Sequence, residues 1–451
     1  MPRTECTQPS FDFAPHFSRE VTARFDGGAM TSDAGGLLLR ATAARMNLFP
    51  RLAACFLDGR DPDRIEHSVE QMVAQRVYGL ALGYEDLNDH EQLRHDPLLR
   101  VMAGEVEQAL AGKSTLNRME LGHGSVDRYK KITFWKPALE ELLVDLFLEA
   151  HDNAPVEIVL DVDTTDLPLH GDQEDKFFHG YYDHYCYLPL YVFCGEHILC
   201  SRLRPANIDA AAGSRKELQR IIQQIRTRWP EVRIIVRGDS GFCRDELMTW
   251  FEQNKVDYVL GLARNPRLRA IIEKEMTAAR EQAQQSGKAE RVFQEFEYET
   301  VSGTWSRVRR IVAKAEYLDN KENPRFVVTS LPAQSWSAQE LYEKLYCARG
   351  DMENRIKEQL SLFAHRVSAS TMRANQLRLF LSSLAYALLC GLRRLGLCAT
   401  DLAEAQAATI RTRLLKIGAR VRVSVRKVWI SMATSYPWPG LFEQVWRQLR
   451  A

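Results

Sequence analysis

Residues 156–163 read VEIVLDVD, and this stretch decides the fold class of the 451-residue chain. Its β-branched and apolar residues predict a buried strand that ends in acidic residues. Runs of the same kind at 185–193 and 197–203 predict two more strands, joined by a turn at Gly195-Glu196. The pattern then continues with a helix at 213–229, a strand at 232–237, a helix at 245–253 and a strand at 256–262. Strands that alternate with helices predict an α/β protein.

The predicted order, β-β-β-α-β-α-β, is that of the ribonuclease H-like fold, so chain-order analogy leads us to expect a core of that class. A charged helix and two alternating stretches predict a β-rich insertion within this core. A helix that starts near Ser337 with a capping-box pattern completes the core. Mainly helical regions flank it on both sides. The expected segments are an N-terminal region at 1–150, the core at 151–265 and 324–360, the insertion at 266–323, and a basic C-terminal region at 361–451.

The charge of the chain is distributed unevenly. The formal net charge is only +1, yet residues 360–451 carry 14 basic and three acidic side chains. Seven of the basic residues lie within 411–427. Such an excess has the electrostatics of polyanion binding, although a solvated helical surface would explain it equally well.

The composition is that of a soluble globular protein, with 45% hydrophobic and 26% charged residues. The first ten residues, MPRTECTQPS, contain no apolar stretch and do not resemble a secretory signal. The longest uncharged apolar run, 379–392, is shorter than the roughly 20 residues that span a bilayer. We therefore expect a cytoplasmic protein with no membrane partner.

Three acidic residues stand where predicted elements would hold them rigidly. Asp163 ends the first strand, Asp239 directly follows the strand at 232–237, and Glu353 lies on the late helix. Each one alone is more often a cap or turn residue, so the hypothesis depends on their combination. Three converging carboxylates are the minimum set of ligands for two Mg²⁺ ions, roughly 3.5–4 Å apart, that catalyse phosphoryl transfer. Mn²⁺ would substitute for Mg²⁺.

The residues around these acids resemble the motifs of DDE transposases from bacterial insertion sequences. Asp163-Thr-Thr is similar to their first motif and Arg237-Gly-Asp239-Ser-Gly-Phe to their second. Tyr346-x-x-Arg349-x-x-x-Glu353 resembles the third motif of the Tyr-Arg-Glu-Lys signature group. FFHGYYDHYCYLPLYVFCG at 177–195 and FDGGAMTSD at 25–33 extend the resemblance over nearly the whole chain.

This resemblance implies a transposase that cleaves the ends of a DNA element and joins them to target DNA. Its partner would be double-stranded DNA, both the terminal inverted repeats and the target, and a homodimer would hold two ends in a synaptic complex in the bacterial nucleoid. The N-terminal region would bind the DNA ends. Two other functions stay open: a DNA-binding protein that has lost catalysis, and a ribonuclease H-like nuclease that only hydrolyses.

Two positions depart from the family pattern or leave a choice open. The family's lysine, two helical turns after the glutamate, is Leu360 here, so Lys357 is the nearest substitute. Asp161 shares a strand face with Asp163 and is a rival for the first acid. We prefer Asp163 because the Thr-Thr pair follows it.

Several side chains are candidates for DNA contact. Tyr346 and Arg349 would line one helix face with Glu353 and hold phosphates, with a surface Arg–Glu ion pair as the alternative. Lys113 and Arg118 would begin either a recognition helix or an ordinary surface helix. The basic candidates in the C-terminal region are Arg411, Arg413, Arg422 and Arg426.

An aromatic, histidine-rich loop follows the first strand. It contains His170, His179 and His184, whose spacing fits no usual zinc site. Stacking on unpaired bases and a packed hairpin are equally good explanations of this loop.

Overall fold

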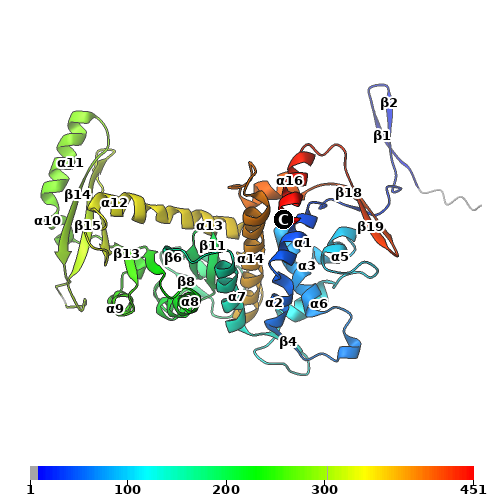
Figure 1. Ribbon diagram of the computed structural model, residues 1–451, viewed down its shortest axis with the longest axis horizontal. Helices are drawn as coiled ribbons and strands as arrows, with labels where there is room; N and C mark the ends of the chain where they lie inside the picture. Colours follow the sequence, from blue (N-terminus) through cyan, green and yellow to red (C-terminus); the bar gives the residue numbers. More distant parts are fainter. Residues whose placement is uncertain (1–8, 302, 451) are drawn as a thin grey trace, which may run out of the picture. The chain divides into compact units, whose positions relative to one another are not determined.

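The computed structural model describes residues 9–301 and 303–450. The chain forms two compact units, one made of residues 1–133 with 391–451 and the other of residues 134–390 (Figure 1). Unit 1 therefore combines the two ends of the chain, and the finer division into five segments stays a prediction. The expected absence of a secretory signal concerns residues 1–10, of which 1–8 lie outside the described residues.

Unit 2 is built on a nine-stranded mixed sheet, which confirms the α/β class. Its central strand β6 (Glu157–Thr164) has the antiparallel β10 (Leu190–Cys194) on one side and the parallel β12 (Arg233–Gly238) on the other. β11 (His197–Arg202) pairs with β10, and β13 (Asp257–Leu262) pairs in parallel with β12. The five strands thus follow the order β11-β10-β6-β12-β13.

The two faces of this sheet are covered by different elements. On one face, Leu160 and Val162 of β6 belong to a core shared with the helices α7 (Lys136–Glu149), α8 (Ser214–Arg228) and α9 (Asp245–Gln253). Because successive strand residues alternate, Asp161 and Asp163 lie on the opposite face. That face packs against a helical segment that follows, along the chain, the last strand of the sheet.

The predicted strand at 185–193 is wrong in one respect. The segment divides into β9 (His184–Tyr187) and β10, which belong to different sheets. Pro189 stands between them and cannot donate to a strand ladder, which accounts for the interruption. β9 instead joins β7 (Leu167–Pro168) and β8 (Phe177–His179) in a small three-stranded sheet.

The segment expected as an insertion extends the main sheet. Its helices α10 (Pro266–Ile271) and α11 (Glu273–Ser286) precede the strands β14 (Glu290–Tyr298) and β15 (Arg309–Leu318), with a short β16 (Lys321–Glu322) beyond. β17 (Arg325–Thr329) pairs with both β13 and β15. The inserted strands are therefore continuous with the core sheet (Figure 1).

The late helix, predicted to begin near Ser337 and to run past Glu353, changes its hydrogen bonding along its length. α12 (Ala338–Glu340) is followed by a π-helical turn (Leu341–Tyr346), a 3₁₀ turn (Cys347–Arg349) and then α13 (Gly350–Leu360). The buried guanidinium of Arg237 donates to the carbonyl of Leu345, within the π-helical turn. Irregular helical turns of this kind are frequent at functional sites.

Unit 2 closes with α14 (Met372–Leu392). In the described part of the chain, the segment Met372–Leu397 is the one helix long and apolar enough to cross a membrane, and 83% of its apolar window is buried within the protein. This burial is typical of a core helix.

In unit 1 the N-terminal part is mainly helical. Its longest helix, α3 (Val69–Leu82), starts with a capping box between Ser68 and Gln71 and ends at Gly83, whose φ of 99° suits glycine. The other principal helices of this part are α1 (Gly36–Arg45), α2 (Leu48–Ala54), α5 (Pro97–Met102) and α6 (Lys113–Glu120).

The C-terminal region was expected to be mainly helical, and its most basic stretch corrects that expectation. Residues Ala419–Ser424 and Lys427–Met432 form a β-hairpin, β18–β19, which pairs with β3 (Met30–Thr31). The sequence VRVSVR alternates with period two, which favours a strand over a helix. α15 (Ala407–Ile410) and α16 (Pro439–Arg450) flank this hairpin in sequence.

Candidate active site

The first two predicted acids lie on neighbouring parallel strands. In the β6–β12 register, Arg237 is opposite Asp161 and Gly238 is opposite Val162. One residue further along each segment are Asp163, near the end of β6, and Asp239, just after β12. Adjacent strands are about 4.8 Å apart, so the sheet brings the two aspartates to one edge and one face.

Arg349 connects the first and third acids. Its Nη1 donates to Asp163 Oδ2 at 3.0 Å, and its Nη2 donates to Glu353 Oε1 at 3.1 Å. Asp163 is 13% exposed, whereas the Glu353 side chain is half-exposed on α13. The three motifs predicted from the sequence therefore meet at one place in unit 2.

The environment of Asp163 raises its pKa to about 6. Burial is the largest cause, and the negative charges of Asp239 and Glu353 add to it, while Arg349 opposes it. Asp163 also accepts a hydrogen bond from the backbone of Thr164 at 2.8 Å. The repulsion among the acids is the kind that a bound cation relieves.

Asp161 has a different partner. Both of its carboxylate oxygens accept from Arg237, at 2.5 Å from Nε and 2.8 Å from Nη2, and the two side chains are 6% and 8% exposed. Both oxygens of Asp161 are thus held by one buried guanidinium, whereas Asp163 lies near the charges of Asp239 and Glu353. The geometry favours Asp163 as the first acid, as the Thr-Thr pair had suggested.

Asp239 lies at the wall of an open cavity of about 610 Å³. Its Oδ1 accepts from the backbone of Gly241 at 2.8 Å, which fixes the carboxylate at the start of a short 3₁₀ turn. Tyr346 and Arg349 line the same cavity. A Cβ at Gly261 would lie 2.7 Å from the Tyr346 hydroxyl, so the phenol needs a glycine there.

Two arginines that the sequence analysis missed also line this cavity. Arg264 and Arg325 are exposed, and neither forms an ion pair within the described part of the chain. Arg264 lies two residues after the end of β13 and Arg325 begins β17, so only the pairing of these two strands brings them together. A cavity with three arginines and a phenol beside a carboxylate is suited to a phosphate-bearing strand.

The donor chemistry fits a divalent metal ion, because carboxylate oxygens are the ligands that Mg²⁺ prefers. In the present arrangement, however, no three His, Cys, Asp or Glu side chains among the described residues converge closely enough to hold one. Arg349 stands between Asp163 and Glu353 and satisfies both of them. Metal binding by all three acids therefore requires this guanidinium to turn away.

The comparison with protein families decides the class of this chain. Residues 13–451 match the family model described as transposase DDE domain group 1. This chain belongs to the DDE transposases. It is a DNA transposase, an enzyme of DNA recombination that cleaves DNA and transfers strands.

No curated protein matches this transposase. Among solved structures it is similar to the piggyBac transposase in a synaptic complex with hairpin DNA, with a TM-score of 0.40 and 10% sequence identity. The match covers 85% of this chain and 79% of that one.

The remaining DNA-contact candidates of the transposase have contrasting surroundings. Lys357 is exposed on α13, one turn after Glu353, and Lys113 and Arg118 are exposed on α6. Arg411 instead donates to the Ala81 carbonyl at 3.2 Å, near the end of α3.

Arg413 is likewise engaged within unit 1. It pairs with Asp401 at 2.8 Å and stacks over Trp438, with 5.0 Å between the guanidinium carbon and the ring centroid. Arg422 and Arg426, by contrast, are exposed on the β18–β19 hairpin. Of the four C-terminal candidates, two therefore have partners within unit 1 and two are exposed to solvent.

The aromatic loop of the transposase is both packed and exposed. His184 Nε2 lies 2.8 Å from Asp166 Oδ2, and Cys186 is buried in a small cluster. Phe178 and Tyr181 are exposed to solvent. Part of the loop is therefore packed, and stacking of its exposed aromatic residues on unpaired bases stays a prediction.

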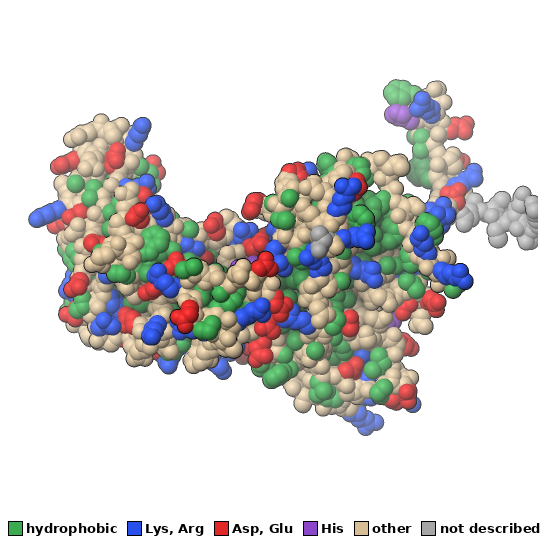
Figure 2. Space-filling model, in the orientation of Figure 1, with side chains coloured by type: hydrophobic (Ala, Val, Ile, Leu, Met, Phe, Trp, Pro, Cys, Tyr) green, Lys and Arg blue, Asp and Glu red, His purple; other side chains and the backbone are tan. Residues whose placement is uncertain are grey.

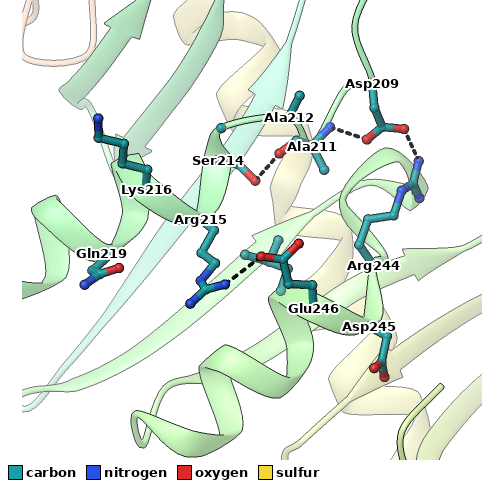
Figure 3. A pocket seen from close by; sticks show the side chains of 12 residues that line it. Asp209, Ala211, Ala212, Ser214, Arg215, Lys216, Gln219, Arg244, Asp245 and Glu246 are labelled. Atoms are coloured by element: carbon teal, nitrogen blue, oxygen red, sulfur yellow. Dashed lines mark hydrogen bonds and ion pairs between the residues drawn. The ribbon is translucent and has the colours of Figure 1, made fainter. Parts of the chain in front are cut away.

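A second cavity, of about 730 Å³, lies at the start of α8 (Figure 3). There Arg215 points toward Glu246 at 2.6 Å, and Arg244 toward Asp209 at 2.7 Å. Because these arginines are already paired, the cavity beside Asp239 is the better candidate for a nucleic-acid strand.

Proposed function

We propose that this transposase cleaves the ends of a bacterial insertion sequence and joins them to target DNA, with two Mg²⁺ ions held by Asp163, Asp239 and Glu353. Mn²⁺ would replace Mg²⁺. The observation that carries the proposal is the position of Asp163 near the end of β6 and of Asp239 just after the neighbouring parallel strand β12, with Arg349 linking Asp163 to Glu353.

We further propose that the core is ribonuclease H-like. The order β11-β10-β6-β12-β13, with β10 antiparallel and β12 parallel to β6, supports this assignment. The chain order predicted from the sequence also supports it.

Bound divalent ions would activate the attacking oxygen and stabilise the leaving one. The chain's own residues supply rigidity: β6 is hydrogen-bonded on both sides, and the Gly241 amide orients Asp239. Arg349 keeps Asp163 and Glu353 neutralised in the arrangement seen here. Once released, its guanidinium can donate two parallel hydrogen bonds to a phosphate in the cavity that it lines with Tyr346.

Assembly and location follow from the same proposal. Two ends must be brought together, so we propose a homodimer in a synaptic complex, acting in the bacterial nucleoid within the cytoplasm. Lys113 and Arg118 on α6 would contact the terminal inverted repeats, and Lys357 would substitute for the family's lysine.

A second candidate function is DNA binding without catalysis. The observation in its favour is that Arg349 stands between two of the acids. Incubation of the protein with terminal-repeat DNA, target plasmid and Mg²⁺ separates the possibilities. Joined products support the transposase, cleavage without joining indicates a nuclease, and binding without cleavage indicates a protein that has lost catalysis.

A further inference from the structure

The β18–β19 hairpin has one apolar face and one basic face. Ala419 belongs to a buried cluster against which Ile430 packs. On the other face the register places Arg422 opposite Trp429 and Ser424 opposite Lys427. The ammonium of Lys427 lies 3.7 Å from the centroid of the Trp429 ring. The exposed face is therefore a row of cations with one aromatic ring.

No acidic residue neutralises this face from within the segment. Residues 405–442 contain no Asp or Glu. Within the described part of the chain, Arg422 and Arg426 form no ion pair and are exposed. Figure 2 shows Lys and Arg side chains gathered where Figure 1 places this hairpin. Arg447, which is exposed on α16 of the same unit, lies by contrast beside an acid, Glu443, at 2.5 Å.

The base of the hairpin is held firmly by the N-terminal motif FDGGAMTSD. β18 pairs with β3, and Val421 donates to the Ala29 carbonyl at 2.9 Å. Asp33, which is 3% exposed, lies 2.6 Å from the ammonium of Lys416 and accepts from the Tyr84 hydroxyl at 2.6 Å. These contacts give a structural role to the motif FDGGAMTSD, which contains none of the predicted catalytic acids.

The tip of the hairpin is closed by hydrogen bonds within the turn, where the backbone N–H of Lys427 donates to Ser424 Oγ at 3.2 Å. Val425 is fully exposed between Ser424 and Arg426. A hairpin with a firmly held base and an exposed, cationic tip is suited to inserting into a binding partner and is not packed against the protein.

We propose that the β18–β19 hairpin binds duplex DNA as a two-stranded ribbon that enters a groove, with Arg420, Arg422, Arg426 and Lys427 on the flanking phosphates. The major groove admits a two-stranded β-ribbon, and phosphate contacts by arginine set its register there. The indole N–H of Trp429 adds a further donor on the same face. The inference rests on the proposed function only in taking DNA as the substrate.

The test is a salt-dependent binding titration of the full-length protein on a short duplex. Arg422→Ala with Arg426→Ala should weaken binding and reduce the slope of log affinity against log salt by about 1.8, since each phosphate contact contributes about 0.9. The matched control is Arg447→Ala with Arg450→Ala, which removes the same charge from the same unit. An unchanged slope in the hairpin variant, or an equal reduction in the control, overturns the inference.

A second variant tests the tip alone. Val425→Asp adds a negative charge where no packing is lost, so its unfolding temperature should equal that of the wild type while duplex affinity falls. The loss should be larger on duplex than on single-stranded DNA of the same length, and an equal loss on both contradicts groove entry.

Failure of this inference and failure of the proposed function give different results. If the wild type cleaves DNA and the hairpin variants bind DNA as tightly as the wild type does, the hairpin inference is wrong and the proposed function stands. If the wild type never cleaves DNA and the hairpin variants bind DNA weakly, the catalytic proposal is wrong and the hairpin inference stands.

Discussion

The guanidinium of Arg349 donates to the carboxylate of Asp163 at 3.0 Å across 186 residues of sequence. The contact joins the late helical segment to the end of the central strand β6. It places a cation where a buried acid meets two other negative charges, and so stabilises the protein without metal.

Asp163→Asn should stabilise the metal-free protein at neutral pH. Burial and the neighbouring acids raise the folded-state pKa of Asp163 to about 6 from an ordinary 3.8. The charged form is therefore penalised: the penalty is absent below about 3.8, grows as pH rises, and is complete above about 6. Two pKa units correspond to roughly 3 kcal/mol in the free energy of unfolding.

Urea unfolding in the presence of a chelator measures this difference. The variant should be more stable than the wild type above about pH 6, and the two should converge near pH 3.8. A variant that loses stability as pH rises, relative to the wild type, contradicts the assignment of charge at Asp163.

Asp161→Asn should have the opposite effect on stability. It removes the bidentate partner of the buried Arg237 and leaves an uncompensated cation, which costs about 3–5 kcal/mol. Replacing both residues, as Asp161→Leu with Arg237→Met, should recover part of this loss. Thermal and urea unfolding of the three proteins check the order, and an Asp161→Asn protein as stable as the wild type would exclude a structural role for the pair.

Arg264→Ala with Arg325→Ala should raise the KM of DNA cleavage more than it lowers kcat. Both side chains line the cavity beside Asp239, and each charge-assisted contact to phosphate is worth about 1.5 kcal/mol, or roughly tenfold. Arg269→Ala is the control, because Arg269 pairs with Glu322 at 3.3 Å and is not part of the cavity wall. Steady-state cleavage of labelled DNA measures both constants, and an equal change in the control would assign the effect to net charge alone.

The core strands and the positions of the three acids could be predicted from the sequence, because β-branched runs and their flanking acids are local patterns. Asp161 and Asp163 could not be separated in this way, since both lie on one strand face. Only the register of β6 with β12, which brings Arg237 opposite Asp161, distinguishes them.

The errors have physical causes, some of them contacts between residues far apart in the sequence. The strand at 185–193 was extended through Pro189, whose missing N–H interrupts the ladder. The late helix was predicted without the hydrogen bond from Arg237 to the Leu345 carbonyl, a contact across 108 residues. The basic C-terminal stretch was taken as helical although VRVSVR alternates with period two. Arg264 and Arg325 were missed because only strand pairing brings them together.

The catalytic role of Asp239 is the central claim, and Asp239→Asn tests it most directly. The substitution keeps the size of the side chain and its hydrogen bond from Gly241 but removes the charge that would hold a divalent ion. Cleavage and joining of terminal-repeat DNA are measured with Mg²⁺ or Mn²⁺, beside a gel-shift titration on the same DNA. The account predicts that the variant binds DNA as the wild type does but neither cleaves nor joins it, whereas cleavage at a near wild-type rate would contradict the assignment of the active site.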